Sequence, residues 1–341
     1  MFEGKIRYFL IVLLLMAAFV ATSYEVHSPD CFWHLAFGKV FVENRHFVRN
    51  EPFAFTTMGK DIYVTSWLYD FFSYLVFEHF GYSGLELSIR LLAVFVMFVL
   101  IKIATMESVE GLVHIIIYYS LFFRLFGSRF RARPESFIIL LYAFLICLLF
   151  LYRKEKLKHL WLFPVVFLIW VQIHPSWVYG MLIIPLFIIE KHGFSLSKKS
   201  LKDLVFMVIL PTFSLFFNPY GYKPFLFPFV SYLTMRSQSK IYSIGEWQPL
   251  KWTFFSTPFL ILPIVLLLLF AFKYLKKEEN LFPILFICIQ TFFLLAWERY
   301  ATFAFIGLSF FAFSFIGYII NMAPRFKKAI YSFSVVLLFL P

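Results

Sequence analysis

The sequence has few charged side chains, and long stretches of it have none at all. Asp, Glu, Lys and Arg together make up 15% of the 341 residues, whereas soluble domains average about 25%. Hydrophobic residues make up 62%, and the mean hydropathy is +0.82. The scarcity of charge therefore argues against a soluble globular protein and in favour of a membrane protein.

Cysteine is equally scarce, with Cys31, Cys147 and Cys288 as the whole complement. The last two fall inside apolar runs, and no pair shares both a compartment and a plausible geometry. We therefore expect neither a disulfide nor a thiolate metal site.

Several motifs of nucleotide-binding and hydrolytic enzymes are missing as well. The chain has no Walker loop, no dinucleotide-binding fingerprint, no His-Glu-x-x-His pair and no nucleophile elbow. Nothing in it predicts ATP binding through a known loop, which suits a functional site outside the cytoplasm.

What the chain does contain is a long series of apolar runs. A run of about 20 apolar residues is long enough to cross a bilayer as a helix. We predict an all-α integral membrane protein, a single polytopic domain over residues 1–341 with about 10–11 transmembrane helices. The expected spans are 6–23, 85–101, 112–126, 136–152, 160–173, 176–190, 203–217, 254–272, 281–296 and 301–320, followed by a short final run at 329–341.

The positions of the charges predict how these spans are oriented. If the N-terminus is cytoplasmic, inner segments carry 17 Lys or Arg against 8 Asp or Glu, and outer segments carry 12 against 11. This is the inside excess that inner (plasma) membrane proteins show. The long outer segments are then 24–84 and 218–253. On this basis the net charge of +12 indicates orientation and contact with anionic membrane lipids, not nucleic acid.

The first outer loop opens with a candidate interfacial helix in Ser28–Arg49. Ser28 can cap a helix whose first residue is Pro29, where the missing N–H is not needed. Helical spacing places four further residues on one face: Asp30, His34, Gly38 and Arg45. This face could carry catalysis. Alternatively, Asp30 only complements the helix dipole and His34 simply bonds to it.

The rest of this loop predicts two more elements. Residues 52–67 contain two β-prone runs around a Met-Gly-Lys-Asp turn, which favours a small hairpin. Ser66 can cap a second interfacial helix that stops at Gly81.

Three arginines, Arg129, Arg131 and Arg133, lie close to Glu135 on the predicted outer side, against the inside bias. The planar guanidinium group grips phosphate or carboxylate through two hydrogen bonds. Phosphate binding and pairing with loop carboxylates are both compatible with this cluster, and the two do not exclude each other.

Two further outer residues are candidates. His174, before Pro175, breaks an apolar hairpin at its outer tip, and ionisable groups at a membrane boundary are often functional. It could equally satisfy backbone carbonyls in a turn. Arg299, beside Glu298, could contact substrate or form a structural pair.

The order of several short motifs resembles a known family. Asp30-x-Phe-Trp-His34-Leu, Pro52-Phe-Ala-Phe-Thr, Ser66-Trp-Leu and Arg90 resemble the first outer loop of bacterial proteins in the GT-C glycosyltransferase superfamily. Later landmarks over most of residues 1–320 are similar too: Arg133-Pro-Glu, Gln172-Ile-His-Pro, Asn218-Pro-Tyr-Gly and Glu246-Trp-Gln-Pro. The resemblance implies about a dozen helices, a sugar donor on a polyprenyl phosphate, and an acid of the first loop at the reaction centre, which matches Asp30.

We therefore expect an inverting glycosyltransferase that moves a sugar from a polyprenyl-phosphate donor to a glycan, lipid or protein acceptor outside the membrane. Asp30 would be the catalytic base. The expected substrate-binding residues are His34, Arg131, Arg133, Glu135, His174 and Arg299. A divalent metal is possible, but Asp30 and His34 alone are too few ligands to predict one. The alternatives are a lipid or solute transporter, and a non-catalytic assembly protein with the same fold.

Overall fold

The computed structural model describes residues 2–22, 28–105, 127–237, 257–277, 279–296 and 300–322. Within these ranges every regular element is helical, and the only β-type pairing is an isolated antiparallel bridge between Asn50 and Asp61. The all-α prediction is confirmed for this part of the chain. The expected span at 112–126 and the final run at 329–341 lie outside the described residues.

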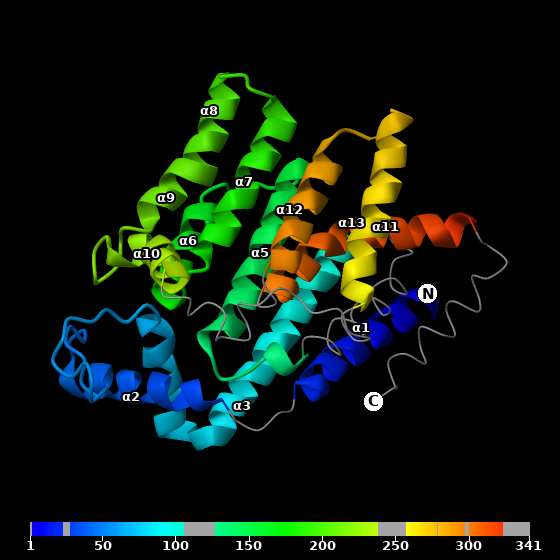
Figure 1. The fold of residues 1–341 in the computed structure, drawn as a ribbon. Coiled ribbons are helices and arrows are strands. Elements are labelled where there is room, and N and C mark those ends of the chain that lie inside the picture. Colours follow the sequence, from blue (N-terminus) through cyan, green and yellow to red (C-terminus); the bar gives the residue numbers. More distant parts are fainter. Residues whose placement is uncertain are drawn as a thin grey trace.

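Figure 1 shows how the described helices are arranged. In chain order they are α1 (Phe2–Ala21), α2 (Pro29–Asn44), α3 (Trp67–Thr105), η1 (Gly127–Arg129), α5 (Pro134–Arg153), α6 (Leu162–Ile173), α7 (Trp177–His192), α8 (Lys198–Leu204), the π-helical η2 (Val205–Ile209), α9 (Leu210–Ser214), α10 (Lys223–Ser237), α11 (Thr257–Leu275), α12 (Phe282–Ala296) and α13 (Ala301–Met322).

Two of the described helices, α3 and α5, are long and apolar enough to cross a membrane. A buried core helix of a soluble protein can have the same length and composition. Shorter apolar helical stretches occur at Tyr8–Ala21, Leu162–Ile173, Ile261–Leu275, Phe282–Ala296 and Ala301–Phe313. The number of spans therefore stays a prediction.

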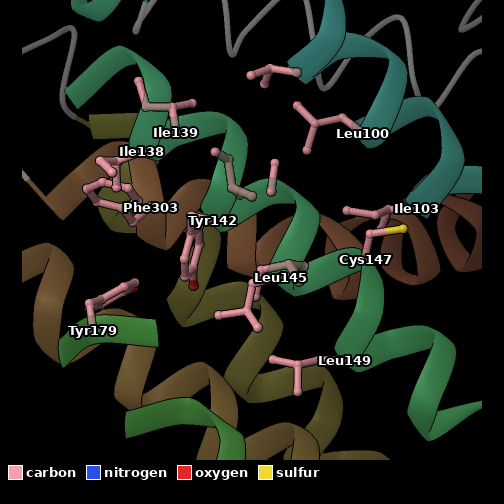
Figure 2. Packing of buried hydrophobic residues seen from close by; sticks show 14 of the residues in the cluster. Leu100, Ile103, Ile138, Ile139, Tyr142, Leu145, Cys147, Leu149, Tyr179 and Phe303 are labelled. Carbon is pink, nitrogen blue, oxygen red and sulfur yellow. The ribbon is translucent and has the colours of Figure 1, made fainter. Parts of the chain in front are cut away.

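Helix α5 is the centre of the hydrophobic core. It packs against α3, α6, α7 and α13, and most of its side chains are buried. Figure 2 shows Tyr142 of α5 directed towards Tyr179 and Phe303, while Leu100 and Ile103 of α3 lie on the other side of the helix. The rings of Tyr142 and Tyr179 are 5.1 Å apart. A helix that is apolar all round, as α5 is, needs neighbours on every side.

One polar group is buried inside this core. Gln290 of α12 is fully buried, and its amide bonds to Tyr142 and to Tyr179. Gly307 of α13 lies against it, where a Cβ atom would come within 2.6 Å of the Gln290 side chain. The two tyrosines satisfy the amide, as a buried polar group requires.

Helix α3 has a sharp kink at Gly81, with φ 61° and ψ −157°. Glycine adopts this backbone conformation without steric cost. The sequence-based prediction that the helix stops at Gly81 is confirmed, and a second arm starts directly after it. The first arm packs on α2 and the second runs beside α1 and α5 (Figure 1).

Gly38 lets α2 and α3 touch backbone to backbone. A Cβ atom at Gly38 would lie 2.1 Å from the carbonyl oxygen of Asp70 and 2.6 Å from Cβ of Tyr74. Only glycine allows this approach. As a result, the α2 side chains that lie one helical turn from Gly38 come close to the first arm of α3.

The predicted hairpin over 52–67 is wrong. The two backbone segments pair only around Asn50 and Asp61, where Glu51 N–H bonds to Lys60 O (2.9 Å) and Ile62 N–H bonds to Arg49 O (2.8 Å). The residues between them form turns. The Glu51 carboxylate accepts from the N–H groups of Phe53 and Ala54, at 2.8 and 3.0 Å. These bonds hold the backbone in a turn where a strand was expected.

The turn predicted at Asn218-Pro-Tyr-Gly is present, with Gly221 N–H bonded to Asn218 O at 2.8 Å and Gly221 at φ 65°. Beyond this turn the sequence predicts no secondary structure within the outer segment 218–253, and Lys223–Ser237 there forms α10. Residues 238–253 lie outside the described part of the chain.

Candidate functional site

A cavity of about 470 Å³ opens between α2, the N-termini of α3 and α5, the α6–α7 turn and α10. Pockets of this volume hold small-molecule or cofactor-sized ligands. Four residues predicted from the sequence line it: Asp30, His34, Glu135 and His174. They come from three segments that are distant in the chain and are brought together by the packing around α5.

The arginine cluster lies next to this cavity. Arg129, Arg131 and Arg133 line a smaller hollow of about 40 Å³, which shares Glu135 and His174 with the larger cavity. All the predicted site residues that the structure describes therefore lie around one continuous region. Arg299 lies outside the described residues.

Asp30 and Arg133 form an ion pair across this region. Asp30 Oδ2 is 3.0 Å from a terminal guanidinium nitrogen of Arg133, with side chains 51% and 19% exposed. Pairing with a loop carboxylate, one of the two roles expected for the arginines, is thus present for Arg133. Because Asp30 is half exposed, the pair contributes little to stability. Its importance is that it fixes where the guanidinium lies.

Ser28 helps to hold Arg133. It occupies the residue before α2, and Pro29 is the first helical residue, as predicted. Its hydroxyl makes no bond to the N–H groups of α2 but accepts from Nε of Arg133 at 2.5 Å. The prediction that Ser28 caps the helix through its side chain is wrong, because a charge-assisted bond to the guanidinium takes the hydroxyl oxygen.

His34 bonds to Asp70 of α3, not to Asp30. His34 Nδ1 is 2.6 Å from Oδ1 of Asp70, and Asp70 is fully buried. Ser66 donates its hydroxyl to both carboxylate oxygens of Asp70, at 3.0 and 3.2 Å. The sequence-based alternative that His34 bonds to Asp30 is wrong. The close approach of the two backbones at Gly38 brings Asp70 within hydrogen-bonding distance of the His34 imidazole.

Burial sets the electrostatics of this pair. Removal from water raises the pKa of Asp70, and the hydrogen bond from His34 opposes that rise. With Nδ1 directed at the carboxylate, the neutral imidazole has its acceptor lone pair on Nε2. His34 also packs edge-on against Tyr69, with ring centroids 5.1 Å apart. The imidazole is thus fixed in position and tautomer at the wall of the cavity.

Glu135 and His174 form a second histidine–carboxylate contact in the lining of the same cavity. His174 Nε2 lies 3.6 Å from Oε1 of Glu135. The Nδ1 atom of His174 accepts the backbone N–H of Ser176 at 3.1 Å. The histidine therefore stabilises the turn, as one alternative expected, although its partner there is an N–H group and not a carbonyl.

Two of the motifs hold the connection between α2 and α3 onto the other helices. Gln172 Oε1 accepts from Trp67 Nε1 and from Asn218 Nδ2, both at 2.8 Å. Tyr220 donates its hydroxyl to the carbonyl of Val48 at 3.0 Å. These residues fix the shape of the cavity without lining it.

The sequence missed part of the cavity wall. Phe227, Phe229 and Tyr232 of α10 line it, together with Phe293 and Tyr300. Their aromatic spacing gave no distinctive signal in a chain with 51 Phe. Asp70 and Ser66 had only a weak signal, since they lie in one predicted helical turn but reach His34 through tertiary contact.

In the part of the chain that the structure describes, no three His, Cys, Asp or Glu side chains are arranged to hold a metal ion. No protein-family model matches the chain, and neither a curated protein nor a solved structure is significantly similar to it. Its function must be inferred from its own residues.

Proposed function

We propose that the chain is a polytopic membrane glycosyltransferase whose active site is the cavity between α2, α5 and α10. It would move a sugar from a polyprenyl-phosphate donor to an acceptor hydroxyl at the outer face, with inversion. The observation that carries this proposal is the gathering of Asp30, His34, Arg133, Glu135 and His174 around one cavity.

The placement in a membrane is supported by how the two ends of α5 differ. Most residues that line the cavity come from segments that the charge pattern assigns to the outside, and Val178 and Phe293 come from the adjoining predicted spans. The other end of α5 meets the Lys-rich segments assigned to the inside. A helix of 20 residues extends about 30 Å, the thickness of a bilayer's hydrocarbon core.

Arg133 would bind the phosphate that leaves with the lipid. A guanidinium offers two parallel N–H groups to phosphate oxygens and stabilises the charge that develops on them. Since Arg133 already holds Asp30 at 3.0 Å, the donor phosphate would compete with this carboxylate. Binding of the donor would therefore release Asp30 towards the acceptor.

Asp30, so released, would take the proton of the acceptor hydroxyl while that oxygen attacks the anomeric carbon. The bond from the anomeric carbon to the phosphate oxygen breaks, and the lipid phosphate leaves with the electron pair. His34 lies one helical turn away on the same wall, with Nε2 as acceptor. It would orient the attacking hydroxyl.

A second, apolar cavity would suit the lipid chain. It has a volume of about 250 Å³ and lies between the two arms of α3 and the start of α5. Tyr69 lines it and also contacts His34. An isoprenoid chain placed there would hold its phosphate near Arg133, since Ala132 lines the same cavity.

The proposal is tested by turnover of a polyprenyl-phosphate-linked sugar with the purified full chain. Arg133→Lys keeps the charge but loses the two-pronged geometry, so transfer should fall while the melting curve is retained. Arg49→Lys is the control, because Arg49 is an exposed arginine of a segment that is also assigned to the outside and it does not line the cavity. It should transfer normally.

Full transfer by Arg133→Ala would contradict the assigned phosphate site. Movement of the lipid across vesicles without formation of a new glycosidic bond would favour the transporter alternative instead.

A further inference from the structure

A second large cavity lies at the end of α5 and α7 far from the candidate active site. It also has a volume of about 470 Å³ and is enclosed by the α5–α6 connection, the end of α7 and α8. In Figure 1 the α7–α8 turn lies at the top of the view and α2 at the bottom. The role proposed for the outer cavity does not involve this one.

Lysines dominate the wall of this cavity. It is lined by four lysines and by only two acidic residues, namely Lys158, Lys191, Lys199 and Lys202 against Glu155 and Asp203. Asp203 is buried and accepts hydrogen bonds from Tyr152 Oη (2.5 Å) and His192 Nε2 (2.8 Å). Its charge is therefore already compensated from within the protein.

The other acid is also engaged. Glu155 lies 3.4 Å from Nζ of Lys191 and 3.9 Å from Nζ of Lys199. Among the residues that the structure describes, Lys158 and Lys202 have no acidic partner, although both face this cavity. Two positive charges in one cavity without a protein counter-charge favour an anionic ligand.

Apolar side chains surround the lysines. Trp161 lines the cavity and is 53% exposed. The adjoining α7–α8 turn leaves Phe194 and Leu196 90% and 78% exposed. Exposed aromatic and aliphatic groups beside lysines are typical of a protein surface at the lipid headgroup level. A small soluble anion would gain nothing from this rim, whereas a lipid would contact both parts.

We propose that this cavity binds the phosphate headgroup of an anionic lipid of the inner leaflet. Lys158 and Lys202 contact the phosphate, and Trp161, Phe194 and Leu196 lie against the glycerol and the upper acyl chain. Basic cavities between helices on the inner side are suited to such headgroups. The inference goes beyond the proposed glycosyl transfer and does not depend on it, but it rests on the membrane orientation proposed above.

The test is a titration of the full chain in detergent with phosphatidylglycerol, followed by native mass spectrometry. Lys158→Gln/Lys202→Gln should weaken binding about 30-fold, because each lysine near an anionic lipid contributes about fivefold. The matched control is Lys156→Gln/Lys198→Gln. It removes two charges from the same two segments, but neither residue lines the cavity. Its effect should stay below about threefold at physiological salt.

Three results would overturn the proposal. Equal weakening by both double variants would mean that diffuse charge, not a cavity, attracts the lipid. Equal affinity for phosphatidylcholine would mean that the apolar rim binds alone. Displacement of the lipid by inorganic phosphate at similar concentration would identify a soluble anion as the ligand. If the double variant fails to fold, Lys158→Gln and Lys202→Gln alone should each weaken binding about fivefold.

Because this experiment does not measure sugar transfer, its failure leaves the function proposed for the outer cavity intact. Equally, absence of transfer would leave the lipid titration valid.

Discussion

At the level of single residues, Asp30 and His34 lie one turn apart on α2 but are held by different partners. Arg133 engages Asp30, and buried Asp70 engages His34. The carboxylate can therefore be released by an anion that competes for the guanidinium. The imidazole stays fixed, because its partner is inaccessible to solvent. This difference separates the two proposed roles.

Substitution of Asp30 by Asn should abolish most transfer. Asn cannot take a proton at neutral pH, and loss of a general base costs about 10²–10⁴ in rate. Donor binding should be unchanged or tighter, since the carboxylate no longer competes for Arg133. Transfer and binding of a lipid-linked sugar measure the two effects separately. Glu43→Gln, an exposed acid on the same helix, is the control. A folded Asp30→Asn protein with normal transfer would contradict the assignment.

The buried carboxylate of Asp70 makes a prediction about pH. Burial raises its pKa above the ordinary 3.8, so the folded state holds this proton at pH values where the unfolded state has lost it. Stability from this group is then present below about pH 4 and is lost as pH rises through the folded pKa. Thermal melting of Asp70→Asn should lack this decline, relative to the native chain. Parallel pH curves for the two proteins would refute the raised pKa.

At the level of elements, the α2–α3 contact decides whether the site exists. Gly38 meets the backbone of α3 and not a flexible side chain, so an added methyl group cannot be accommodated by a rotamer change. The bond between His34 and Asp70 depends on this contact. The sequence predicts α2 as a helix, but it does not show that one glycine fixes the position of the partner helix.

Gly38→Ala should destabilise the protein in spite of alanine's better helix propensity. The better helix propensity stabilises the folded protein by about 1 kcal/mol, whereas overpacking against backbone costs about 1–3 kcal/mol or more. Because the added Cβ would lie 2.1 Å from Asp70 O, the cost here is at the upper end of that range. A lower melting temperature is the expected result. Lys39→Ala, on the exposed neighbouring position, should change it little. Equal melting of both variants would show that α2 can move away from α3 without cost.

Helix boundaries followed the sequence where apolar runs end in charge or proline. The expected spans at 136–152 and 281–296 correspond closely to Pro134–Arg153 and Phe282–Ala296. Prediction missed α10, which contains Pro224 and Pro228, since proline disfavours a helix interior. It also failed at the hairpin, where the Glu51 carboxylate, not strand propensity, sets the turn.

At the level of the whole molecule, the two large cavities lie at opposite ends of α5. Acidic and arginine side chains line the region near α2, and lysines line the cavity near α8. The proposed orientation with α2 outside would account for both, since Lys-rich segments are kept on the cytoplasmic side of membranes.

The orientation can be tested by cysteine labelling in intact cells with an impermeant reagent. Lys39→Cys and Lys60→Cys should react from outside, and Lys158→Cys only after permeabilisation. Background is low, because Cys31 is buried and burial raises its pKa to about 11. Cys288, which is exposed on α12, should be replaced by serine. Labelling of Lys158→Cys without permeabilisation would reverse the topology and remove the outer site with it.

The sequence by itself determined the helical class, most helix boundaries and the identity of the polar residues worth testing. These follow from local properties, namely apolar run length, proline and glycine positions, and charge excess. Tertiary structure decided the partners: Asp30 with Arg133, His34 with Asp70, and Glu135 with His174. Pairings across tens of residues depend on how helices cross. For His34 and Asp70, steric contact at Gly38 sets this crossing, and no periodicity in the sequence encodes it.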